Sequence, residues 1–87
     1  MAVHLLDISH NSHKFLNKLP PEQFRQIGRA LFGLTKNPCP TDSEHLIGYS
    51  GYMRKDVREY RIIYYLTNKI VKILLVGTRN VPVSIKL

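Results

Sequence analysis

The feature that most constrains this chain is a pair of strand-like stretches separated by a short polar turn. Residues 59–66 read EYRIIYYL and residues 70–77 read IVKILLVG, so both are rich in the β-branched, aromatic and aliphatic residues that favour strands. The residues between them, TNK at 67–69, are few enough for a hairpin loop. We therefore predict an antiparallel hairpin over residues 59–77. Residues 52–56 precede it and predict a further strand.

The first half of the chain has the periodicity of helices. Four apolar side chains recur at helical spacing: Phe24, Ile27, Leu31 and Leu34. Pro21 suits the first turn of a helix and Glu22 complements the positive end of its dipole, while Asn37-Pro38 stops it, which predicts a helix over residues 21–36. A shorter helix begins at the small polar residues 9–12, which are candidate N-caps.

The predicted order of elements is strand, helix, helix and then three strands. Residues 3–9 predict the first strand, residues 37–51 a loop, and residues 81–85 a short edge strand, a position that tolerates Pro82. The fold class is therefore α+β: an N-terminal strand, an αα-hairpin and a C-terminal antiparallel sheet, in a single domain over residues 1–87. We expect the two helices to cover one face of the sheet.

The chain is strongly basic. It carries 13 Lys and Arg residues against six Asp and Glu, a formal net charge of +7. Eight of the 13 basic residues follow Ser43, where the predicted sheet lies. A basic surface binds polyanions because each neutralised phosphate releases condensed counterions. The charge favours a nucleic acid or an acidic protein as partner, and solubility alone is the plainer alternative.

Several classes of protein are disfavoured by what the sequence lacks. The single cysteine, Cys39, cannot form an internal disulfide, and its place between two prolines offers no base to activate a nucleophile. His10 and His13 have metal-ligand spacing, but no Asp, Glu or Cys completes a recognisable set, so we expect no metal and no cofactor. No GxSxG, Walker or GxGxxG motif is present.

The N-terminal residues lack the basic start and long apolar core of a signal peptide. No apolar run reaches the ~20 residues that a membrane-spanning helix needs. We therefore expect a cytoplasmic protein without membrane contact.

Alternation along residues 59–66 places Arg61 on the face opposite Ile62 and Tyr64, which we expect to pack under the helices. An Arg among apolar strand residues is costly unless it meets water, a carboxylate or a phosphate. The functional interpretation of Arg61 is phosphate binding, and a structural ion pair with Glu59 or Asp56 is the alternative.

Other basic residues are predicted to gather near Arg61. Arg79 follows the last strand of the hairpin, and antiparallel pairing brings it back towards Arg61. Arg54, Lys55 and Arg58 lie on the adjoining strand and turn. Three segments therefore direct basic groups to one patch, which we interpret as the functional site.

Five short stretches, in their order and spacing, make the chain resemble the RelE/ParE toxin superfamily over nearly its full length. They are KFLNKLP at 14–20, LTKNP at 34–38, LIG at 46–48, EYRIIY at 59–64 and VGTR at 76–79. The superfamily's topology matches the predicted order of elements. The resemblance implies a RelE-like toxin of a type II toxin–antitoxin system. Such a toxin is a ribosome-dependent, metal-independent endoribonuclease that cleaves messenger RNA in the decoding site beside ribosomal RNA and is neutralised by a cognate antitoxin.

The resemblance also implies a role for each basic residue. The reaction is attack of a ribose 2′-OH on its own 3′-phosphate, so Arg61 and Arg79 are expected to stabilise the charged phosphorane. Lys55 is the candidate base, because Arg is a poor proton acceptor. Arg54 and Arg58 are expected to bind RNA phosphates.

The sequence departs from the superfamily's pattern in two places. Asp56 occupies a position where a basic residue is common. Residues 81–87 lack the tyrosine that some members carry near the C-terminus. Either the activity is weaker, or another side chain such as Tyr52 or His45 substitutes.

Two further functions are compatible with the sequence. ParE-like members poison DNA gyrase and need no catalytic patch, so their toxicity need not depend on Arg61 and Arg79. An inactive binding module would use the basic patch only to meet an acidic partner, and the missing tyrosine leaves that alternative open.

Overall fold

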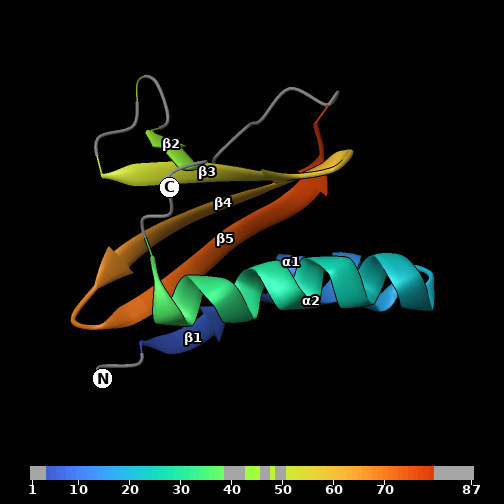
Figure 1. Cartoon of the computed structure of the whole chain (residues 1–87), viewed down its shortest axis with the longest axis horizontal. Helices are drawn as coiled ribbons and strands as arrows, with labels where there is room; N and C mark the ends of the chain where they lie inside the picture. Colours follow the sequence, from blue (N-terminus) through green and yellow to red (C-terminus); the bar gives the residue numbers. More distant parts are fainter. Residues whose placement is uncertain (1–3, 39–42, 46–47, 49–50, 80–87) are drawn as a thin grey trace.

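The computed structural model describes residues 4–38, 43–45, 48 and 51–79. Within these ranges the elements follow the order β1 (Leu5–Ile8), α1 (His10–Asn17), α2 (Pro21–Lys36), β2 (Ser43–His45), β3 (Tyr52–Val57), β4 (Tyr60–Thr67) and β5 (Ile70–Thr78). The helices lie together on one side of a sheet (Figure 1). The α+β class and the predicted helix over residues 21–36 are confirmed. The predicted strand over residues 81–85 and Cys39 lie outside the described residues.

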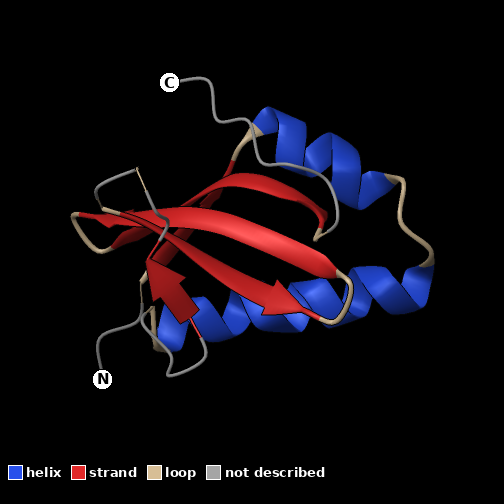
Figure 2. Ribbon diagram, turned by 90° about the horizontal axis from the view of Figure 1, so that it is seen from above, coloured by secondary structure: helices blue, strands red, loops and turns tan. Residues whose placement is uncertain are grey.

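The five strands form one twisted sheet in the order β1-β5-β4-β3-β2 (Figure 2). The predicted hairpin is confirmed as the antiparallel pair β4–β5, and β3 pairs antiparallel with β4. Asn68 and Lys69 form the β4–β5 turn with φ values of 47° and 63°, the left-handed backbone of a two-residue hairpin turn. Strand β1 joins the sheet beside β5 in parallel, so the sheet is mixed.

Strand β2 corrects the prediction that residues 37–51 form only a loop. Its residues pair with β3 in the register Ser43↔Lys55, Glu44↔Arg54 and His45↔Met53. The sequence Ser-Glu-His has little intrinsic preference for a strand. The exposed edge of β3 and an ion pair between Arg54 and Glu44 provide what the local sequence lacks.

Helix α1 is fixed to the sheet at its first turn. Ser9 is its N-cap, as predicted, and the Ser9 Oγ accepts the backbone N–H of Ser12 at 3.2 Å. The same hydroxyl lies 2.9 Å from the carbonyl oxygen of Leu74, to which it donates. Leu74 lies where β5 carries an extra residue opposite the Ile63/Tyr64 step of β4. The cap therefore positions α1 against a bulge of β5.

The core lies between the helices and one face of the sheet. Its fully buried members include Ile27 of α2, Ile62 and Tyr64 of β4, and Ile73 of β5. The Tyr64 hydroxyl donates to the carbonyl oxygen of Pro38 at 2.7 Å, so a polar atom at the edge of the core is satisfied. Burial of Ile62 and Tyr64 under the helices confirms the face predicted for them. In the described ranges, no helix combines the length and apolar character needed to cross a membrane.

Candidate functional site

An ion pair between neighbouring strands lies on the sheet face that the helices leave uncovered. Asp56 of β3 and Arg61 of β4 are directly opposite each other in the antiparallel register. The Arg61 Nε donates to the Asp56 Oδ1 at 2.8 Å, and the Arg61 Nη2 donates to Oδ2 at 3.4 Å. The structural pair with Asp56, one of the two alternatives predicted for Arg61, is therefore present.

Arg79 joins this pair from the end of β5. Its backbone N–H donates to the carbonyl oxygen of Glu59 at 2.8 Å, and its Nη1 donates to the carbonyl oxygen of Arg58 at 2.9 Å. These two bonds hold the Arg79 side chain over the β3–β4 turn, with its Nε 3.6 Å from the Asp56 Oδ2. One carboxylate thus lies between two guanidinium groups, and the predicted return of Arg79 towards Arg61 is found.

Gly77 keeps one side of this cluster open. It lies opposite Arg61 in the β4–β5 register, so any side chain at this position would stand on the face of Arg61. A Cβ atom added to Gly77 would have no neighbour within 4 Å. Among the described residues, the position of Gly77 therefore leaves open space on the face where Arg61 stands.

The charges of the cluster stabilise one another. The hydrogen bond from Arg61 lowers the pKa of Asp56 below its ordinary value of 3.8, against a smaller opposing effect of burial. The positive charges of Arg61, Arg79 and Arg54 lower it further. The hydrogen bond to Asp56 in turn raises the pKa of Arg61. Asp56 is therefore an ionised, weakly basic carboxylate at neutral pH, and Arg61 keeps its charge.

Lys55 is not brought to this cluster. Lys55 pairs with Ile62 across β3 and β4, and Ile62 is fully buried under the helices. Because paired residues of adjacent strands share a face, Lys55 stands on the opposite face of the sheet from Arg61. The predicted convergence of Lys55 with Arg61 and Arg79 is therefore corrected by the register.

The remaining predicted residues are distributed over and beside the same face. Arg54 stands on the face of Arg61 and is ion-paired with Glu44 of β2. Arg58 is exposed in the β3–β4 turn. Tyr52 also stands on this face, where its ring lies 5.3 Å from that of Tyr65. It is four residues from Asp56, about 13 Å along the strand. His45 pairs with Met53 of the core and so belongs to the other face.

Within the described residues, no three His, Cys, Asp or Glu side chains gather as metal ligands would. His10 and His13, the pair with metal-ligand spacing, are exposed on α1.

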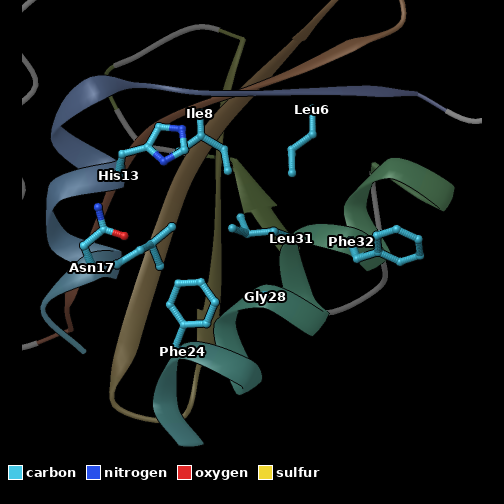
Figure 3. A pocket seen from close by; sticks show the side chains of 9 residues that line it. Leu6, Ile8, His13, Asn17, Phe24, Gly28, Leu31 and Phe32 are labelled. Atoms are coloured by element: carbon cyan, nitrogen blue, oxygen red, sulfur yellow. The ribbon is translucent and has the colours of Figure 1, made fainter. Parts of the chain in front are cut away.

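A second surface feature is an apolar groove of about 390 Å³ between β1, α1 and α2. Leu6 and Ile8 border it from β1, and Phe24, Leu31 and Phe32 from α2 (Figure 3). The Phe24 and Phe32 side chains, about two turns apart on α2, are 45% and 61% exposed, so two large aromatic rings border the groove from one helix. The helical periodicity used above placed Phe24 in one apolar stripe with Ile27, Leu31 and Leu34 and gave no sign of this groove.

Comparison with known proteins identifies the architecture. No protein-family model matches the chain, and no curated protein does. Among solved structures, a RelE–RelB complex from Pyrococcus horikoshii is similar with a TM-score of 0.79 at 26% identity, covering 92% of this chain and 98% of that one. The chain has the RelE fold. The isolated Escherichia coli RelE toxin matches with a TM-score of 0.77 at 20% identity, covering 91% of this chain and 87% of that one.

A RelBE toxin–antitoxin complex from Mycobacterium tuberculosis is similar to the same degree, with a TM-score of 0.79 at 24% identity, covering 91% of this chain and 94% of that one. The RelE fold thus extends over nearly the whole chain. In this chain, the strand register and the ion pairs place the Arg61–Asp56–Arg79 cluster on the face of β3, β4 and β5 that the helices do not cover. The resemblance to RelE toxins predicted from short sequence stretches is confirmed.

Proposed function

We propose that the chain is the toxin of a type II toxin–antitoxin system and acts in the cytoplasm as a metal-independent endoribonuclease on ribosome-bound messenger RNA. The observation that carries the proposal is the convergence of Arg61 and Arg79 on the uncovered face of a RelE-like sheet. The similarity to RelE toxins, two of them in toxin–antitoxin complexes, supports it.

The two arginines suit the charge that develops during RNA cleavage. The ribose 2′-oxygen forms a bond to the adjacent phosphorus while the bond to the 5′-oxygen breaks. The 2′-OH proton passes to solvent water, and the departing 5′-oxygen takes a proton from solvent water. The phosphorane between these events carries two negative charges, and guanidinium groups match phosphate oxygens in geometry and remain charged. Arg61 and Arg79 are the proposed stabilisers of that charge.

A phosphate can share these arginines with Asp56. A guanidinium group has five N–H donors, and the contacts of Arg61 with Asp56 use two of its groups, Nε and Nη2. The remaining donors and the open space beside Gly77 are available to a phosphate. Because Lys55 stands on the other face of the sheet, the proposal gives it no role in this mechanism.

The test is translation in vitro with purified ribosomes, with messenger RNA 5′-ends mapped by primer extension. We expect ribosome-dependent cuts with the wild-type protein and none with Arg61→Ala/Arg79→Ala. The matched control is Lys36→Gln/Lys69→Gln, which removes the same charge at exposed positions and should cut as the wild type does. An intact message with the wild-type protein, or inhibition of DNA gyrase supercoiling in its place, would contradict the proposal.

We also propose that a protein antitoxin neutralises the chain by covering the apolar groove. The solved neighbours include complexes of RelE with RelB, and an acidic antitoxin complements the net charge of +7. Phe24→Ser/Phe32→Ser should weaken binding to the product of the adjacent gene by tenfold or more, since buried aromatic anchors contribute upwards of about 1 kcal/mol each. Leu66→Ser, which removes an exposed apolar side chain from β4, is the control. Equal affinities of the two variants, measured by calorimetry, would contradict this placement.

A further inference from the structure

A polar cleft of about 430 Å³ lies between α2 and the β3–β4 turn. Its charged and polar lining is Glu22, Arg25, Gln26 and Arg29 from α2, and Arg58 from the turn. Three guanidinium groups from two distant parts of the sequence therefore border one small space. Figure 1 shows the N-terminal half of α2 and the β3–β4 turn at the same end of the molecule.

The positive charge of this cleft is largely uncompensated. Arg25 and Arg29 are four residues apart on α2, an arrangement in which like charges face each other and destabilise a helix. All three arginines are exposed, and within the described ranges none of their side chains has an ion pair. Of the described residues that line the cleft, one is a carboxylate, Glu22, against three guanidinium groups. The cleft is therefore suited to an anionic ligand.

The cleft adjoins the Arg61–Asp56–Arg79 cluster. The Arg79 Nη1 donates to the backbone carbonyl of Arg58, whose side chain borders the cleft. Arg58 has a φ of 54°, so the turn places this arginine in the left-handed region that is uncommon for a residue with a side chain. Basic groups consequently continue from the uncovered face of the sheet, around the β3–β4 turn, to the side of α2.

We propose that the Arg25–Arg29–Arg58 cleft binds the sugar–phosphate backbone of an RNA strand. The phosphates bound there belong to other nucleotides of the strand than the phosphate held by Arg61 and Arg79. The position of the cleft along the strand rests on the proposed function, but its binding of RNA does not require cleavage. Guanidinium forks match phosphate oxygens, and the described residues that line the cleft are all charged or polar. The lining therefore favours RNA over an antitoxin segment, for which the apolar groove offers the aromatic contacts.

The test measures binding alone. Fluorescence anisotropy of a labelled 2′-O-methyl oligouridine, which lacks the attacking hydroxyl and cannot be cleaved, is recorded between about 50 and 200 mM KCl. Arg25→Gln/Arg29→Gln is compared with Lys36→Gln/Lys69→Gln, which removes two charges at the opposite end of α2 and in the β4–β5 turn. Gln is a good helix former, so α2 is retained in the cleft variant, as far-UV circular dichroism will verify.

The cleft variant should have a shallower salt dependence. Loss of two phosphate contacts lowers the slope of log K against log salt by about 1.4 for a single strand. The affinity advantage of the wild type should therefore shrink about sevenfold between 50 and 200 mM KCl. The control variant should keep the wild-type slope, and Arg58→Gln should lower it by about half as much as the double variant.

Equal slopes for the cleft and control variants would overturn the proposal. It would also be overturned if the cleft variant lost affinity for an oligoglutamate peptide and kept its affinity for RNA. The ribosome assay tests the endoribonuclease proposal, and its outcome is independent of the binding measurement. If the cleft variant has a reduced salt slope but the wild type makes no mRNA cuts, the RNA-binding cleft is supported and the endoribonuclease proposal is refuted. If the wild type makes cuts but the cleft variant keeps the wild-type slope, the endoribonuclease proposal is supported and the cleft proposal is refuted.

Discussion

Asp56→Asn tests whether the carboxylate between the two arginines stabilises the fold through its charge. The change removes the charge and leaves the shape nearly unaltered. Asp56 accepts two hydrogen bonds from Arg61 and lies 3.6 Å from Arg79, but its side chain is 35% exposed, so solvent screens these contacts. We therefore expect a loss of about 1 kcal/mol in the free energy of unfolding at pH 7. In a domain of this size that corresponds to a fall of about 4–8 °C in Tm.

The sign of the pH dependence follows from the pKa of Asp56. Because the Arg61 hydrogen bond lowers the pKa in the folded chain, the folded state binds fewer protons than the unfolded state near pH 4. The contribution of Asp56 to stability is fully present above the unfolded pKa of 3.8 and is lost as the pH falls through the lower folded value. The wild type should therefore lose more stability than Asp56→Asn on going from pH 5 towards pH 2.

Urea unfolding followed by far-UV circular dichroism at pH 7, 5, 4, 3 and 2 measures the difference directly. The other carboxylates are common to both proteins, so their titration cancels in the comparison to a first approximation, and what differs is the charge of Asp56 itself. A difference between the two proteins that stays constant from pH 7 to pH 2 would refute the charge-based reasoning. With Arg61 and Arg79 released from the carboxylate, we also expect Asp56→Asn to bind the uncleavable RNA more tightly than the wild type.

Two other changes test the parts of the structure that position the site. Gly77→Val should lower mRNA cleavage by roughly ten- to hundredfold by filling the space beside Arg61, because small displacements of a reacting group are costly. Its thermal unfolding should be unchanged or raised, since Val favours strands, and a lowered Tm would contradict this explanation. Ser9→Ala removes the α1 cap and the bond to Leu74, so urea unfolding should show a loss of about 1–2 kcal/mol. A loss near zero would contradict the anchoring of α1 to the bulge.

The sequence predicts those elements whose own residues specify them. The β4–β5 hairpin and α2 are confirmed because each has a long, regular apolar pattern and a recognisable turn or stop signal. Strand β2 was not predicted, because three polar residues become a strand only when the edge of β3 is available to them. The parallel pairing of β1 with β5 was not predicted either, since it joins residues far apart in the sequence.

For the site, the sequence predicts which strand ends meet but not which side chains face each other. Antiparallel pairing was sufficient to bring Arg79 back to Arg61. The partner of Arg61 depends on the length of the β3–β4 turn, because one residue more or less would exchange the two faces of β3. The two-residue turn of Arg58 and Glu59 places Asp56 beside Arg61 and turns Lys55 away. If a two-residue turn at Arg58 and Glu59 is assumed from the sequence, antiparallel pairing places Asp56 directly opposite Arg61.

The place of β5 in the sheet has a consequence for folding during synthesis. β5 lies between β1 and β4, and each residue of its partner β1 is made 65 positions before the β5 residue with which it pairs (Leu5 with Ile70, for example). A nascent chain that ends before residue 70 leaves β1 without a partner and exposes the apolar faces of β4 and α2. Such non-local pairing is slow, because the loop must close before the contact forms. Arg79 follows β5 directly, so the guanidinium pair is assembled only after the whole sheet has been synthesised and has closed.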